Sequence, residues 1–210
     1  MEIIKKVLLE NKAWARSKID VNPDYFTTMA KDQNPTFLWI GCADSRVPPS
    51  EITNTHPGDM FVHRNIANLA VHTDSNLLSV MQYAVEALKI PHIIVCGHYN
   101  CGGVKAALSQ QSLGLIDNWI RNIKDVAFQH RAELAEIDRS EDRVNRLVEL
   151  NVIQQTKNIA HSSIIQKAWK ERGEYPIIHG WVYDLNNGQL KILNTINAKD
   201  TIDREYFYEF

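Results

Sequence analysis

The sequence is short of the features that mark several classes of protein. Its 210 residues carry a formal net charge of −2, so a surface for nucleic acid or for an anionic membrane is not indicated. No apolar run approaches the roughly 18–20 residues of a membrane span. There is also no linker, repeat or low-complexity tract. These absences favour a globular protein that has neither nucleic acid nor a membrane as partner.

Cysteine is scarce, and the start of the chain lacks a targeting pattern. Three cysteines are an odd number, so a disulfide framework is not expected. Cys96 lies in the apolar run HIIVCG and is interpreted as a buried small side chain. The first residues, MEIIKKVLLENKAW, are charged throughout and lack the apolar block and cleavage site of a signal peptide. We therefore expect a cytoplasmic protein.

The hydrophobic residues that are present are arranged as in an α/β protein. They make up 44% of the chain, which is enough for a substantial core. TFLWIGC (36–42), DMFVHR (59–64) and HIIVCG (92–97) read as short strands, and a helical pattern that begins near Ser75 separates the last two. Strands that alternate with helices predict a central, mostly parallel sheet flanked by helices.

The two ends of the chain add further elements. Residues 3–19 have helical spacing, and their apolar stripe consists of Ile3, Ile4, Val7, Leu8 and Trp14. This stripe requires a partner surface on this chain or on a neighbouring subunit. Residues 116–138 and 141–172 are also predicted to be helical. Asn187-Gly188, between two β-rich runs, predicts a C-terminal hairpin. We expect one domain over residues 1–210, with residues 1–30 forming a helical arm.

Three potential metal ligands follow two of the predicted strands. Cys42 ends one strand, and His98 and Cys101 come directly after another. Loops at the carboxyl ends of parallel strands converge, so these side chains are expected to meet. Two sulfurs and one nitrogen suit zinc. The helix predicted near Gly102 is expected to favour the thiolate of Cys101.

Asp44 and Arg46 lie in the same short segment as Cys42, in CADSRVPP. Asp44 is either a fourth zinc ligand or a partner of Arg46 that leaves a position on zinc for water, as in catalytic sites. Taken alone, His-x-x-Cys arises often by chance and Asp-x-Arg is usually a weak surface pair. Their combination at two strand ends favours the metal site.

At this point the sequence resembles a β-class carbonic anhydrase. The resemblance runs along essentially the whole chain. It rests on the complete motif C-x-D-x-R…H-x-x-C and on four segments, namely CADSRVP (42–48), HRNIAN (63–68), SVMQYAVEALKIPHIIVCGHYNCGGV (79–104) and HGWVYDLNNG (179–188).

The resemblance implies a site and a reaction. One zinc per subunit would be bound by Cys42, His98 and Cys101, with Asp44 and Arg46 as the catalytic pair and Asp44 also able to bind zinc. The implied reaction is reversible hydration of carbon dioxide to bicarbonate and a proton by zinc-bound hydroxide. Gln33 and Gly102 match positions that line the substrate pocket.

The resemblance also implies assembly and regulation. Family members form homodimers that pair into homotetramers, and the N-terminal arm would grip a partner. The bicarbonate-regulated (type II) subgroup binds an inhibitory bicarbonate away from zinc. Trp39, Arg64 and Tyr183 match that allosteric site, which implies inhibition by bicarbonate and by low pH. Each of these three residues also has an ordinary structural interpretation, in the core, in an ion pair or in a strand.

Two other functions stay open from the sequence. One is a zinc-stabilised binding or bicarbonate-sensing module without turnover, in which Asp44 is a fixed fourth ligand. The other is a relative that acts on carbon disulfide or a similar linear molecule. The presence of Arg46 favours the catalytic interpretation, because a purely structural zinc site would not need this arginine.

Overall fold

The computed structural model describes all residues from 1 to 210 and divides them into two compact units, 1–34 and 35–210. The first unit consists of helices α1 (Glu2–Val21) and α2 (Tyr25–Met29). Trp14 packs edge-on against Phe26 with ring centroids 5.7 Å apart. The helix predicted over residues 3–19 is confirmed, and none of its residues is buried.

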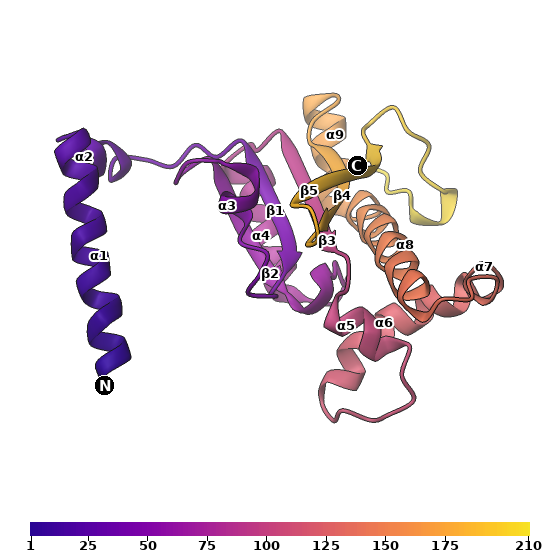
Figure 1. Cartoon of the computed structure of the whole chain (residues 1–210). Coiled ribbons are helices and arrows are strands. Elements are labelled where there is room, and N and C mark those ends of the chain that lie inside the picture. Colours follow the sequence, from indigo (N-terminus) through magenta and orange to yellow (C-terminus); the bar gives the residue numbers. More distant parts are fainter. The chain divides into compact units, whose positions relative to one another are not determined.

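The second unit is built on a five-stranded sheet in the order β2-β1-β3-β4-β5 (Figure 1). The first four strands are parallel and β5 runs antiparallel to β4. The strands are β1 (Phe37–Cys42), β2 (Met60–Asn65), β3 (His92–His98), β4 (Ile177–Asp184) and β5 (Gln189–Ile196). The α/β fold with a mostly parallel sheet and a C-terminal antiparallel pair is as predicted.

Seven helices belong to this unit. They are α3 (Pro49–Thr53), α4 (Ser75–Gln82), α5 (Gly102–Ala107), α6 (Ile116–Gln129), α7 (Arg131–Ala135), α8 (Ser140–Ala160) and α9 (Ser163–Arg172). The single helical stretch predicted for residues 141–172 is divided because Ser162 has extended backbone angles and caps α9, its hydroxyl accepting from the Ile165 amide. No helix combines the length and the apolar character needed to cross a bilayer.

The sheet buries side chains on both faces, as parallel sheets do. Leu38, Ile40 and Val95 face the main core, which also contains residues of α4, α5, α6, α8 and α9. Trp39, Ile94 and Cys96 alternate with them and form a smaller cluster on the other face. The strand ends of β1 and β3 are therefore fixed from two sides, and the residues that follow them start from defined positions.

Candidate metal centre

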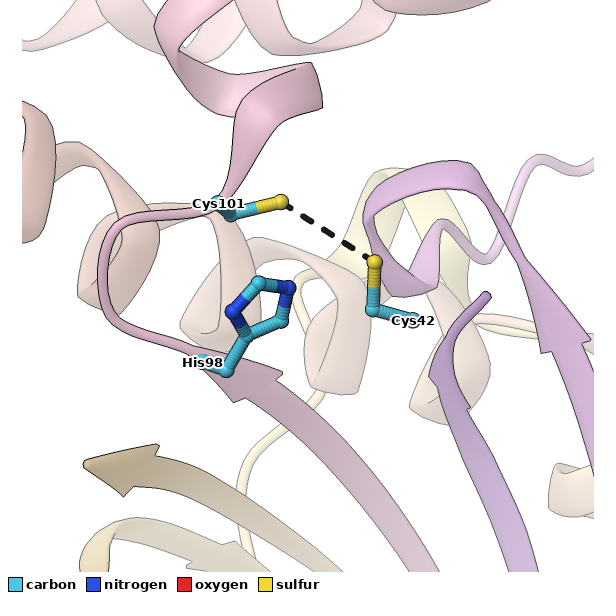
Figure 2. A group of neighbouring side chains, drawn as sticks. All are labelled: Cys42, His98 and Cys101. Atoms are coloured by element: carbon cyan, nitrogen blue, oxygen red, sulfur yellow. Dashed lines mark hydrogen bonds between the residues drawn. The ribbon is translucent and has the colours of Figure 1, made fainter. Parts of the chain in front are cut away.

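The ends of β1 and β3 bring three potential metal ligands together. Cys42 is the last residue of β1, His98 is the last residue of β3, and Cys101 directly precedes α5. Figure 2 shows the three side chains pointing toward one another from these elements. Their ligand atoms all lie within 4.8 Å of one another, and all three residues are buried. The convergence predicted from the sequence is therefore present.

His98 is oriented to serve as a ligand through Nε2. Its Nδ1 lies 3.0 Å from the backbone oxygen of Tyr99, which favours the tautomer with the proton on Nδ1. Its Nε2 is buried and has no hydrogen-bond partner in the protein. A buried polar atom without a partner is costly, so this nitrogen calls for a group that the side chains do not supply.

The spacing of the donors fits zinc. Two sulfurs bound about 2.3 Å from a tetrahedral zinc stand roughly 3.8 Å apart, and the Sγ atoms of Cys42 and Cys101 are 4.0 Å apart. Both cysteines are free thiols. Two sulfurs and one imidazole nitrogen are a donor set that zinc prefers.

The two thiols of the cluster are not equivalent. The contact with the Cys101 sulfur lowers the pKa of the Cys42 thiol against the effect of burial. The same contact, together with burial, raises the pKa of Cys101, although the Gly103 and Val104 amides at the start of α5 act to lower it. The amides at the start of α5 thus act on Cys101 in the expected direction, and the sulfur–sulfur contact acts against them.

Asp44 is held by Arg46 at the edge of the cluster. Arg46 donates through Nε to Oδ1 at 3.0 Å and through Nη2 to Oδ2 at 2.8 Å, so the pair is bidentate. Donation from Arg46 holds the pKa of Asp44 well below its usual range. Oδ2 of Asp44 is 3.7 Å from Nε2 of His98. The carboxylate is thus paired with Arg46 and also faces the metal-binding nitrogen.

Arg64 fixes the backbone of this segment. It lies on β2 opposite Gly41, and its Nε donates to the Cys42 carbonyl at 2.8 Å. Its Nη2 donates to the Asp44 carbonyl. The sequence suggested Arg64 for a second anion site or for an ion pair, so its contact with the metal-ligand segment is an additional finding.

Trp39 and Tyr183 belong to the same small hydrophobic cluster on the second face of the sheet. Trp39 is fully buried, and its indole N–H has no hydrogen-bond partner. The structure therefore brings two of the three proposed anion-site residues into one cluster, while Arg64 is directed to the carbonyls of Cys42 and Asp44.

The two residues proposed for the substrate pocket fall in different units. Gly102 begins α5 next to Cys101 and is exposed, and a side chain added there would meet open space. Gln33 is exposed in the N-terminal unit. Cys96 is fully buried, and burial raises the pKa of its thiol, so its interpretation as a packed, inert side chain is confirmed.

The sequence reasoning missed the residues of α8 that contact the loop between the ligands. Glu149 accepts a hydrogen bond from the Tyr99 hydroxyl at 2.6 Å, and Asn145 accepts one from the Asn100 amide at 3.0 Å. A signal was available for Glu149, because it stands between the apolar Val148 and Leu150 in a helical pattern. An acid at such a position is rarely buried without partners.

Comparison with known proteins identifies the family. The carbonic anhydrase family model matches residues 37–190. A carbonic anhydrase of Emericella nidulans is 48% identical over 189 residues, which cover 90% of this chain and 82% of that protein. A tetrameric β-carbonic anhydrase of Sordaria macrospora superposes with a TM-score of 0.89 at 40% identity, covering 93% of this chain and 100% of that one. A β-carbonic anhydrase of Aspergillus fumigatus gives a TM-score of 0.86 at 39% identity, with 94% and 92% covered. The chain therefore belongs to the β-class carbonic anhydrase family and is an enzyme of that family.

Proposed function

We propose that this chain catalyses the reversible hydration of carbon dioxide to bicarbonate and a proton, with one zinc ion per subunit bound by Cys42, His98 and Cys101. The observation that carries the proposal is the buried, unpartnered Nε2 of His98, which lies with two cysteine sulfurs inside a 4.8 Å cluster. Membership of the carbonic anhydrase family supports the same reaction.

The residues around the cluster suit this chemistry. A bound zinc would supply hydroxide at neutral pH by lowering the pKa of water. Asp44 stays ionised because Arg46 lowers its pKa, so its carboxylate would accept a hydrogen bond from that hydroxide and orient it. The hydroxide oxygen would form a bond to the carbon of carbon dioxide as one C=O π bond opens, which gives bicarbonate, and the proton released when water becomes hydroxide would pass to solvent. Gly102 leaves space beside Cys101 for the linear substrate.

The pairing of Asp44 with Arg46 favours an enzyme over a purely structural zinc site. A structural site requires four fixed protein ligands. Both carboxylate oxygens of Asp44 accept from Arg46, which supports a role for Asp44 as the partner of Arg46 in this state, with zinc binding by Asp44 reserved for a second state. A position for water is thus compatible with the arrangement.

The substitution Asp44→Asn tests the catalytic assignment. We expect it to remove most of the carbon dioxide hydration measured by stopped flow with a pH indicator, while zinc content stays close to one per subunit. Asp142→Asn, at an exposed position in the first turn of α8, is the matched control and should keep both. Loss of zinc from the Asp44 variant would make Asp44 a structural ligand. A zinc-loaded wild type without carbon dioxide hydration would contradict the proposed reaction. Activity would then be measured on a panel of other linear substrates that includes carbon disulfide.

We also propose inhibition by bicarbonate and by low pH, through a second anion site formed by Trp39, Arg64 and Tyr183. The partnerless indole N–H of Trp39 and the guanidinium of Arg64 are suitable donors for a carboxylate-like anion. Arg64 also contacts the Cys42 and Asp44 carbonyls, so an anion that recruited it would act on the metal-ligand segment. Released from Arg46, Asp44 could then bind zinc.

Trp39→Phe tests this regulatory site, because it keeps an aromatic ring and removes the N–H. Initial rates are measured against added bicarbonate at constant pH and ionic strength. We expect cooperative inhibition in the wild type and a weaker, simple inhibition in the variant. Identical curves for the two proteins would contradict the proposed site.

Assembly and location complete the proposal. We propose a homodimer that pairs into a homotetramer, with residues 1–30 packing on a partner subunit and Gln33 reaching the neighbouring pocket. The exposed apolar residues of α1 and the tetrameric Sordaria macrospora relative support this. We propose a cytoplasmic location because all three cysteines are free thiols.

A further inference from the structure

We propose that Glu149 is a positioning residue for the metal ligand His98 and that it acts through Tyr99. This inference rests on the zinc site proposed above. It concerns a charged group on α8 that does not belong to the ligand cluster. A chain of contacts leads outward from His98 through Tyr99 to Glu149.

The first step is the contact between His98 and the backbone of the next residue. Nδ1 of His98 lies 3.0 Å from the Tyr99 carbonyl oxygen, so the position of that peptide determines the orientation of the imidazole ring. Hydrogen-bond partners of a ligating histidine fix its tautomer and ring orientation. The geometry of the Tyr99 peptide is therefore part of the geometry of the metal site.

The second step is the anchoring of Tyr99. Its amide donates to the Tyr183 carbonyl on β4 at 3.0 Å. Its hydroxyl donates to Oε1 of Glu149 at 2.6 Å. The residue is therefore held at its backbone by the sheet and at the end of its side chain by α8.

The third step is the anchoring of Glu149 itself. Lys191 on β5 donates to Oε1 at 2.6 Å, and Arg146 donates to Oε2 at 2.7 Å. Only 12% of the Glu149 side chain is exposed. Burial acts to raise the pKa of Glu149, but donation from Lys191, Tyr99 and Arg146 lowers it overall. Glu149 is thus a fixed carboxylate with partners on α8, β5 and the metal-ligand loop.

A neighbouring contact keeps the rest of the loop in register with α8. The Asn100 amide donates to Oδ1 of Asn145 at 3.0 Å, and Asn100 has a positive φ of 56°. Asn145 and Glu149 are one helical turn apart and face the same loop. The four-residue segment from His98 to Cys101 is therefore attached to α8 at two points between its ligands.

Tyr99→Phe is the direct test, because it removes only the hydroxyl and leaves Glu149 with Arg146 and Lys191. Glu149→Gln is the second variant. The matched control is Glu133→Gln, which removes the negative charge that accepts from Arg146 at 2.5 Å and does not touch Tyr99. Zinc affinity is measured by competition with a chelator. The absorption bands of the cobalt(II)-substituted protein report the ligand geometry, and thermal unfolding of the metal-free protein reports stability separately.

We expect Tyr99→Phe and Glu149→Gln each to weaken zinc binding roughly 10-fold, at the lower end of the range for outer partners of a ligating histidine, and to shift the cobalt bands. The two changes together should weaken it no more than Glu149→Gln alone, because both act on the contact between the Tyr99 hydroxyl and the charged Glu149. Glu133→Gln should stay within about twofold of the wild type.

Zinc affinity and cobalt bands like those of the wild type would overturn the inference, even if the variants were less stable, since a merely structural role would lower stability alone. An equal loss in Glu133→Gln would overturn it too. A wild type that failed to bind one zinc would instead contradict the proposed function, so the two failures are distinguishable.

Discussion

Helices α1 and α8 have nearly the same length and opposite surroundings. α1 has 20 residues, none of them buried, whereas α8 has 21 residues and buries eleven of them. Apolar residues at helical spacing occur in both. Periodicity therefore predicts that a helix forms. Whether its apolar residues are buried depends on the surface that packs against them, and α1 has no such surface within its own unit.

The buried residues of α8 are also chemically mixed. Glu149, Asn151, Gln155 and Thr156 are polar, and all four have hydrogen-bond partners outside α8. Asn151 donates to the Ala67 carbonyl at 3.1 Å, and Gln155 accepts from the Ala70 amide at 2.8 Å. α8 therefore hydrogen-bonds to the backbone of the segment between β2 and α4 in addition to filling the core.

The largest expected effect on stability comes from truncating a buried apolar side chain of α8. Leu147 is fully buried, and Leu147→Ala should lower the free energy of unfolding by about 2–5 kcal/mol. Leu9→Ala in α1 is the matched control, since Leu9 is 65% exposed and lies away from the apolar stripe; its cost should be within about 0.5 kcal/mol. Urea unfolding of both variants measures the contrast. Equal costs would contradict the assignment of α8 to the core.

The second prediction asks whether α1 has its surface on another subunit. Leu8 belongs to the apolar stripe and is 59% exposed in the single chain. If a partner covers it, Leu8→Ser should weaken assembly by about 1.5–3 kcal/mol, and Leu9→Ser should not. Light scattering over a dilution series should show the Leu8 variant separating into smaller species first. Equal masses for both variants at every concentration would exclude this stripe as the contact.

The sequence predicted the alternation of strands and helices well and the packing of α8 poorly. Cys42, His98 and Cys101 were identifiable because ligand types stand at strand ends, where parallel topology forces convergence. The division of residues 141–172 at Ser162 was missed because an extended residue at a cap leaves the apolar pattern nearly uninterrupted. The contacts of Arg64 and Glu149 join residues far apart in the chain, so no local pattern encodes them.

The third prediction concerns the buried amide of Gln155. Replacement by leucine leaves the Ala70 amide without its acceptor, which should cost about 1–3 kcal/mol of stability. Gln154→Leu is the control, because Gln154 is only half-buried and its amide contacts Asn158 on the same helix. Denaturant unfolding compares the two. A Gln155 variant as stable as the Gln154 variant would mean that the loop finds another acceptor.

The smallest expected effect is the pH dependence that Glu149 gives to stability, and it belongs to α8 because α1 buries none of its residues. The pKa of Glu149 is lowered in the folded chain, because donation from Lys191, Tyr99 and Arg146 outweighs burial. The unfolded chain therefore binds this proton more readily. The contribution of the charge is fully present above the ordinary pKa of about 4.3 and is lost as the pH falls through the lower folded value.

The difference in unfolding free energy between the wild type and Glu149→Gln should accordingly shrink from neutral pH into that acidic range. Because burial opposes the three donors, the net lowering is a difference between opposing effects, and the slope should be shallow. A difference that stays constant with pH, or grows as the pH falls, would show that Glu149 is not held as a carboxylate by these three groups.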